Sequence, residues 1–140
     1  MNTEIKKMQD DFALFDDWEE RYRYIIELGS QLAPLQADEY NESNKVQGCV
    51  SQAWLICEGN ADKLILRGDS DAHIVRGLIA ILLMLYSGKS AQTILALNAK
   101  DIFQQLGLGE HLTPQRSNGF YAMVDRIRSD TETFLGGCKP

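Results

Sequence analysis

The chain has 140 residues and a mass of 15.8 kDa, which is the length of one ordinary domain, so we expect a single domain over residues 1–140. Hydrophobic residues make up 44% and charged residues 24%, a composition that excludes disordered and collagen-like classes. With 14 Lys and Arg against 20 Asp and Glu, the net charge is −6, which disfavours binding to nucleic-acid phosphates.

Neither a membrane segment nor a disulfide framework is indicated. The longest apolar run, from Leu78 to Tyr86, is far shorter than the roughly 20 residues of a membrane helix. No apolar stretch follows the lysines near the N-terminus, as one would in a signal peptide. Cys49, Cys57 and Cys138 are odd in number and lack short spacings, which predicts free thiols in a reducing compartment. We therefore expect a cytoplasmic protein.

Helical spacing of apolar residues predicts two helices at the start of the chain. The first covers Thr3 to Phe15, and the second begins near Asp16, where Asp16 and Glu19 resemble a capping box. Pro34 ends the second helix, because proline disfavours helical geometry in the residue before it.

The middle of the chain predicts a β-hairpin. Ser51–Cys57 and Lys63–Arg67 are rich in bulky and β-branched residues, and Glu58 to Asp62 separate them. We expect a shorter strand just before Cys49, and the Trp54 side chain in the core.

The second half of the chain predicts helices again. Ser70 or Asp71 caps a helix that runs to about Ser87, and its body is apolar on every side, as in a central buried helix. Short helices follow over 90–97 and 100–106, and a long helix runs from Thr113-Pro114 to Gly136-Gly137. The expected fold is α+β, with helices packed on one face of a small antiparallel sheet and a mobile tail over 136–140.

Cys49 is the candidate reactive residue. It follows Gly48 in a turn before the predicted strand, in a cysteine loop that covers residues 46–52. A thiolate there can attack sulfur or a carbonyl near neutral pH. The residues alone also allow a buried cysteine that acts as a small hydrophobic side chain.

The remaining candidates each have a structural interpretation. Cys57 fits a packed strand residue, and Cys138 lies at a chain end. Asp69-Ser70-Asp71 fits a helix cap, followed by His73 as a lone candidate base. Arg116 stands in the first turn of the last helix, where a cation is unfavourable unless a carboxylate or an anion offsets it. Its alternatives are an ion pair or a place near Cys49, where its charge favours the thiolate.

Four blocks of the sequence resemble a known family in the family's order. The blocks are Asp17 to Tyr22 with Tyr24 to Gly29, Gln47 to Trp54, Gly68 to Ala72 with Ile74 to Ala80, and His111 to Gly119. Together they resemble SufE, the family of sulfur-acceptor proteins of iron–sulfur cluster assembly. Ser51-Gln52 after the cysteine makes the chain more similar to SufE proper than to its CsdE relatives.

The resemblance implies an accessory protein of sulfur transfer and not an enzyme. The protein would take persulfide sulfur from a SufS-like cysteine desulfurase onto Cys49 and thereby stimulate the desulfurase. It would then pass the sulfur to an iron–sulfur scaffold complex. The pyridoxal phosphate belongs to the desulfurase, so this chain needs no cofactor or metal. Second-rank site residues are Arg116, Asp71, Gly48 and Gln52. The implied fold resembles IscU-type scaffolds, and the implied state is a monomer or weak homodimer.

Three other functions remain open at this point. A metal- or cluster-binding scaffold would gather Cys49 with other soft ligands, such as Cys57, Cys138, His73 or His111, although no ligand spacing organises them. A cysteine hydrolase would need a base beside Cys49. An interaction module would carry an inert cysteine. For the carrier, we expect Cys49 tucked against an apolar wall in the free protein, in a loop that extends when the desulfurase docks.

Overall fold

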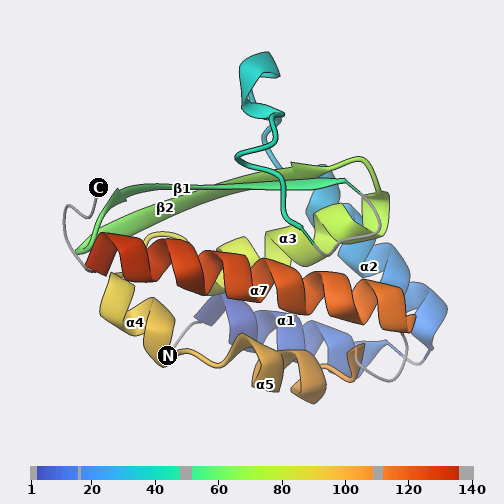
Figure 1. The fold of residues 1–140 in the computed structure, drawn as a ribbon. Coiled ribbons are helices and arrows are strands. Elements are labelled where there is room, and N and C mark those ends of the chain that lie inside the picture. The colour runs from blue at the N-terminus through green and yellow to red at the C-terminus, as the bar shows by residue number, and fades with distance from the viewer. Residues whose placement is uncertain (1–2, 16, 48–51, 109–111, 136–140) are drawn as a thin grey trace.

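The computed structural model describes residues 3–15, 17–47, 52–108 and 112–135. One β-hairpin packs against a layer of helices (Figure 1). The elements are α1 (Thr3–Leu14), α2 (Trp18–Ser30), the 3₁₀ turn η1 (Ala37–Glu39), β1 (Ala53–Asn60), β2 (Lys63–Ser70), α3 (His73–Tyr86), α4 (Ala91–Ala96), α5 (Ala99–Gln105) and α7 (Pro114–Leu135).

The predicted hairpin is confirmed, and its strands are longer than expected. β1 and β2 pair antiparallel from Ala53↔Ser70 to Asn60↔Lys63. The turn is tight because the Asn60 side-chain oxygen accepts hydrogen bonds from the backbone N–H groups of Asp62 and Lys63. The expected short strand before the cysteine is a single bridge between Lys45 and Trp54.

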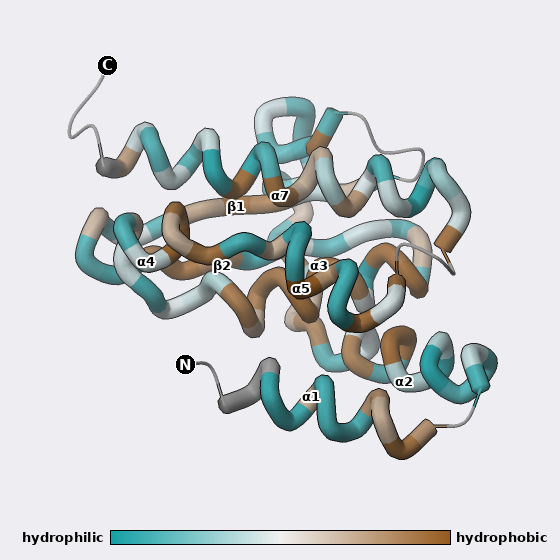
Figure 2. Tube along the Cα trace, turned by 90° about the horizontal axis from the view of Figure 1, so that it is seen from below, coloured by the Kyte–Doolittle hydropathy of each residue, from teal (hydrophilic) through white to brown (hydrophobic). Residues whose placement is uncertain are grey.

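α3 is the central buried helix that its all-round apolar sequence predicts. It packs beneath β2 and against α2, and its brown colour in Figure 2 marks the hydrophobic centre of the molecule. Close approach to α2 depends on two glycines, Gly29 and Gly77. A Cβ on Gly77 would lie 2.2 Å from the carbonyl oxygen of Ile25, so only glycine allows this contact.

Helices cover one face of the hairpin, which confirms the predicted α+β class. α7 runs along β1, with Phe120, Met123, Val124 and Ile127 buried. The segment that contains η1 lies over the opposite face (Figure 1). Among the described residues, no helix combines the length and apolar character needed to cross a membrane.

Three local predictions are corrected by the structure. Asp17, and not Asp16, caps α2 by accepting a hydrogen bond from the Glu20 N–H, while Asp16 lies outside the described residues. Neither Ser70 nor Asp71 caps α3, because β2 extends to Ser70 and the N-cap position is Ala72, without a side-chain cap. Trp54 lies half-buried on the outer face of the sheet, against the ring of Tyr40.

Candidate functional site

The cysteine loop connects two segments that are hydrogen-bonded to each other. The Val46 N–H donates to the Ala53 carbonyl at 2.8 Å, and the Leu55 N–H donates to the Asn44 carbonyl at 2.9 Å. Val46 and Ala53 are buried, whereas Gln47 and Gln52 are exposed. The loop therefore leaves the core and returns to it at neighbouring points.

Gln52, at the end of the loop, is held by the junction between β2 and α3. Its N–H donates to Asp71 Oδ1 at 3.1 Å, and its carbonyl accepts from the Asp71 N–H at 3.2 Å. The Ser70 hydroxyl donates to the same carbonyl at 2.6 Å. The side chains of Ser70 and Asp71, which the sequence predicts as helix caps, therefore hold the end of the cysteine loop.

The carboxylate of Asp69 connects the residues of this junction. Its carboxylate is 9% exposed in a region where an unpaired charge would be unfavourable. Oδ1 accepts from the Ser70 N–H at 2.8 Å and forms an ion pair with Arg76 Nε at 3.0 Å. Oδ2 accepts from the Tyr40 hydroxyl at 2.7 Å, a bond that raises the pKa of Tyr40. Three segments of the chain thus meet at one carboxylate.

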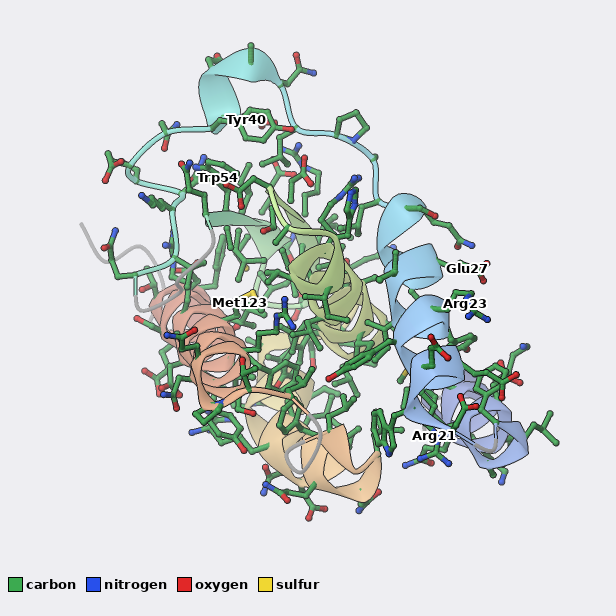
Figure 3. The ribbon with its side chains drawn as sticks, turned by 90° about the vertical axis from the view of Figure 1, so that its right-hand side faces the viewer. Arg21, Arg23, Glu27, Tyr40, Trp54 and Met123 are labelled. Atoms are coloured by element: carbon green, nitrogen blue, oxygen red, sulfur yellow. The ribbon has the colours of Figure 1, made fainter. Side chains whose placement is uncertain are left out.

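An ion-pair network fixes η1 to the sheet next to Tyr40. Arg67 on β2 binds both carboxylate oxygens of Glu39, at 2.9 and 2.5 Å, and its Nε binds Glu58 at 2.8 Å. The Arg67 hydrogen bonds lower the pKa of Glu39 to about 2. A paired, two-pronged contact of this kind fixes orientation as well as charge. Figure 3 shows Tyr40 and Trp54 on this outer face, one above the other.

Arg116 lies at a groove beside the same junction. The groove has a volume of about 320 Å³ and is lined by Tyr22, Ile26, Ala72, His73, Ile74 and Arg116. Arg116 is exposed, and its backbone N–H donates to the Thr113 hydroxyl at 3.3 Å, so the Thr113 side chain caps α7. Among the described residues Arg116 has no ion-pair partner, so the anionic partner expected from its position is not one of them.

The structure brings together part of the predicted site. Gln52 and Asp71 are in contact, and Arg116 shares a groove with Ala72, the next residue along. Gly48, Cys49, His111, Cys138 and the tail over 136–140 lie outside the described residues, so the expected apolar wall behind Cys49 stays a prediction. Tyr40 and Ser70 are missed by sequence reasoning as loop-positioning residues. Their partners are distant in sequence, and no local pattern indicates them.

Cys57 is a half-buried strand residue, as expected. It lines a groove with Arg126, Asp130 and Phe134. Burial, followed by the charges of Asp130 and Glu58, raises the pKa of its thiol to about 11. The thiol is therefore protonated and weakly nucleophilic near neutral pH. No cluster of metal-ligating side chains forms among the residues that the structure describes.

A hairpin covered on one face by helices, with residues 46 and 53 paired where the cysteine loop begins and ends, defines an α+β protein. Three comparisons extend this description. The family model described as SufE, Fe-S metabolism associated domain, matches residues 6–131. An uncharacterized SufE-like protein of Rhizobium meliloti (strain 1021) is 48% identical, over 93% of this chain and 96% of that protein.

A second uncharacterized SufE-like protein, from Rhizobium etli, is 52% identical over 91% of this chain and 89% of that protein. The solution structure of a hypothetical protein from Thermus thermophilus has a TM-score of 0.77 at 20% identity, and the match covers 95% of this chain and 96% of that one. That likeness supports the fold alone. The chain belongs to the SufE family, whose domain is associated with iron–sulfur metabolism.

Proposed function

We propose that the chain is a sulfur acceptor of iron–sulfur cluster assembly and that Cys49 carries the sulfur. The observation that carries the proposal is the anchoring of the loop around Cys49. Val46 pairs with Ala53 at its base, and Gln52 is bonded to Asp71 and Ser70. Membership of the SufE family supports the same role. A loop fixed at both ends presents a thiol to a second protein while limiting the entropy lost on docking.

The proposed partner is a cysteine desulfurase that holds sulfur as a persulfide. The Cys49 thiolate attacks the terminal sulfur of that persulfide, and a new S–S bond forms. The old S–S bond breaks, and its electron pair returns to the desulfurase cysteine as a thiolate. The terminal sulfur moves to Cys49 with its proton, so the exchange needs no oxidant or reductant. Emptying the desulfurase in this way stimulates its turnover.

Delivery to an iron–sulfur scaffold follows the same chemistry in the other direction. A scaffold thiolate attacks the terminal sulfur on Cys49, and Cys49 is released as a thiolate. The chain is thus an accessory transfer protein, and the pyridoxal phosphate chemistry belongs to its partner. The role requires a reducing compartment, where free thiols persist.

Mass spectrometry of the intact protein tests the proposal. The wild type, Cys49→Ser and Cys57→Ser are each incubated with a SufS-type desulfurase and cysteine, without added reductant. We expect the wild type and Cys57→Ser to gain one sulfur atom at Cys49 and to stimulate cysteine turnover. Cys49→Ser should do neither while it remains folded. Full stimulation by Cys49→Ser would contradict the carrier role.

A further inference from the structure

The segment that leads into the cysteine loop carries a polar contact, between Tyr40 and Asp69, that the proposed function above does not use. The part of this segment around η1 lies over the outer face of the hairpin (Figure 1). Beyond Tyr40 the segment returns to α7, where Arg126 donates hydrogen bonds to the carbonyls of Ser43 and Lys45. Tyr40 lies in the middle of this segment, directly after η1. Its ring packs edge-on against Trp54 of β1, with 4.9 Å between the ring centroids.

The Tyr40 hydroxyl joins this segment to the β2–α3 junction. It accepts a hydrogen bond from the Leu35 N–H at 3.2 Å and donates one to Asp69 Oδ2 at 2.7 Å. Because the nearly buried Asp69 carboxylate also forms an ion pair with Arg76, this bond is of the charge-assisted kind, which is stronger than a neutral one. Removing the hydroxyl would leave one carboxylate oxygen without this donor.

From Asp69 the contacts continue to the far end of the cysteine loop. Asp69 Oδ1 accepts from the Ser70 N–H, and the Ser70 hydroxyl donates to the Gln52 carbonyl at 2.6 Å. The path from Tyr40 to Gln52 therefore consists of hydrogen bonds through Asp69 and Ser70. In the other direction along the chain, Tyr40 leads within a few residues to Asn44 and Val46, which pair with β1.

The segments on both sides of the cysteine loop are thus bonded to one carboxylate. Tyr40, on the segment that leads into the loop, donates to it, and Ser70 links it to Gln52 at the leaving end. A change at Tyr40 alters how these segments are held without touching the loop itself. Small errors in the placement of a reacting atom lower transfer rates steeply, so such a tie affects the chemical step.

We propose that Tyr40 is a positioning residue for sulfur acceptance, acting through its hydrogen bond to Asp69 on the segments at both sides of the cysteine loop. The inference rests on the proposed function of Cys49. If Tyr40 had a purely structural role, its substitution would lower only the stability of the protein. If Tyr40 is a positioning residue, its substitution lowers the rate of sulfur transfer within the docked complex and leaves the affinity of docking unchanged.

Single-turnover transfer from a persulfide-loaded desulfurase to Cys49 tests the proposal. Tyr40→Phe keeps the ring on Trp54 and removes only the hydroxyl. The matched control is Tyr121→Phe, which removes a phenol hydroxyl that accepts a hydrogen bond from Gln104 at 3.2 Å. We expect the saturating rate of Tyr40→Phe to fall about tenfold or more, as for loss of one hydrogen bond to a charged group. The half-saturation concentration of Tyr40→Phe should match the wild type. For Tyr121→Phe, both the saturating rate and the half-saturation concentration should match the wild type.

A second variant separates the hydrogen bond from ring packing. Asp69→Asn leaves Tyr40 in place and weakens its acceptor, so its saturating rate should also fall. Hydrogen exchange at the Gln52 amide should be faster in both variants, because the tie to the loop end is weakened. The proposal is overturned if either folded variant has the saturating rate of the wild type. It is also overturned if only the half-saturation concentration changes. Should the wild type itself take up no sulfur on Cys49, the proposed function fails instead.

Discussion

Gln52 and Asp71 exchange a pair of hydrogen bonds across the end of the cysteine loop. The Gln52 N–H donates to Asp71 Oδ1 at 3.1 Å, and the Asp71 N–H donates to the Gln52 carbonyl at 3.2 Å. One of these bonds depends on a side chain and the other on the backbone alone. Asp71 therefore contributes an anchor that substitution can remove without breaking the backbone pairing.

Asp71→Ala should loosen the end of the cysteine loop, whereas Asp71→Asn should hold it. Alanine removes the oxygen that accepts from the Gln52 N–H, and asparagine retains one. We expect exchange of the Gln52 amide to accelerate about tenfold in Asp71→Ala, as for loss of one charge-assisted bond. Hydrogen exchange with mass spectrometry of the peptide that contains Gln52 measures this. Equal exchange in wild type and Asp71→Ala would show that the side chain is not an anchor.

Glu39 should make the stability of the protein depend on pH in the acid range. Its pKa is lowered from 4.5 to about 2 by the hydrogen bonds from Arg67. A depressed pKa in the folded state contributes stability above pH 4.5, which is lost as the pH falls toward 2. Glu39→Gln should therefore be less stable than the wild type near neutral pH, and the difference should vanish near pH 2.

Urea titrations across this range measure the difference. Glu42→Gln is the control, because the Glu42 side chain is exposed and forms no ion pair with any described residue. Its unfolding midpoint should follow the wild type at every pH. A constant gap between Glu39→Gln and the wild type down to acid pH would mean that the ion pair with Arg67 is not its cause.

Cys57 should react slowly with alkylating agents in the folded protein. With a pKa of about 11, less than about a thousandth of its thiol is ionised near neutral pH. We expect iodoacetamide to leave Cys57 unmodified on the time scale of an ordinary exposed thiol, and its reactivity to rise as the pH is raised. Peptide mass spectrometry measures the modification, with urea-unfolded protein as the control. Rapid labelling of Cys57 in the folded state would contradict its burial.

Gly77→Ala should destabilise the contact between α2 and α3. The added methyl would lie 2.2 Å from the Ile25 carbonyl oxygen and 2.4 Å from Ile25 Cγ2, so the helices must separate. We expect a loss of about 3 kcal/mol, at the upper end for overpacking. Gly88→Ala is the comparison, since its Cβ meets no atom within 4 Å and its φ of +83° makes the substitution unfavourable by roughly 1 kcal/mol. Equal urea midpoints for the two variants would contradict the packing argument.

Local patterns predict the elements of this fold better than they predict the site. The apolar sequence of α3 and the alternation in the hairpin correspond to what each element buries, so both are readable from the chain. Asp69-Ser70-Asp71 has the composition of a helix cap, yet Asp71 bonds to Gln52, 19 residues earlier. An Asp or Ser side chain can accept from the N–H groups of a helix start or from a residue distant in sequence, and only the tertiary fold decides between these partners. Tyr40 follows a stretch without periodicity, so nothing local indicates its bond to Asp69.

Arg116 should contribute to docking of an acidic partner surface rather than to stability. It is exposed at the groove between α2, α3 and α7, and no described carboxylate pairs with it. A cation in the first turn of a helix is unfavourable by about 0.3–1 kcal/mol, so Arg116→Ala should unfold at the same urea concentration as the wild type or slightly higher. Its affinity for the desulfurase should fall, and the fall should shrink as salt screens the charge.

Calorimetric titration with the desulfurase at low and high salt separates charge from shape at this position. Arg116→Lys should retain most of the affinity if charge alone matters, and behave like Arg116→Ala if the partner requires the two-pronged guanidinium. Arg23→Ala is the matched control, because Arg23 is an exposed arginine on α2 that does not line the groove (Figure 3). If Arg116→Ala and Arg23→Ala bind equally well at low salt, the charge of Arg116 takes no part in docking.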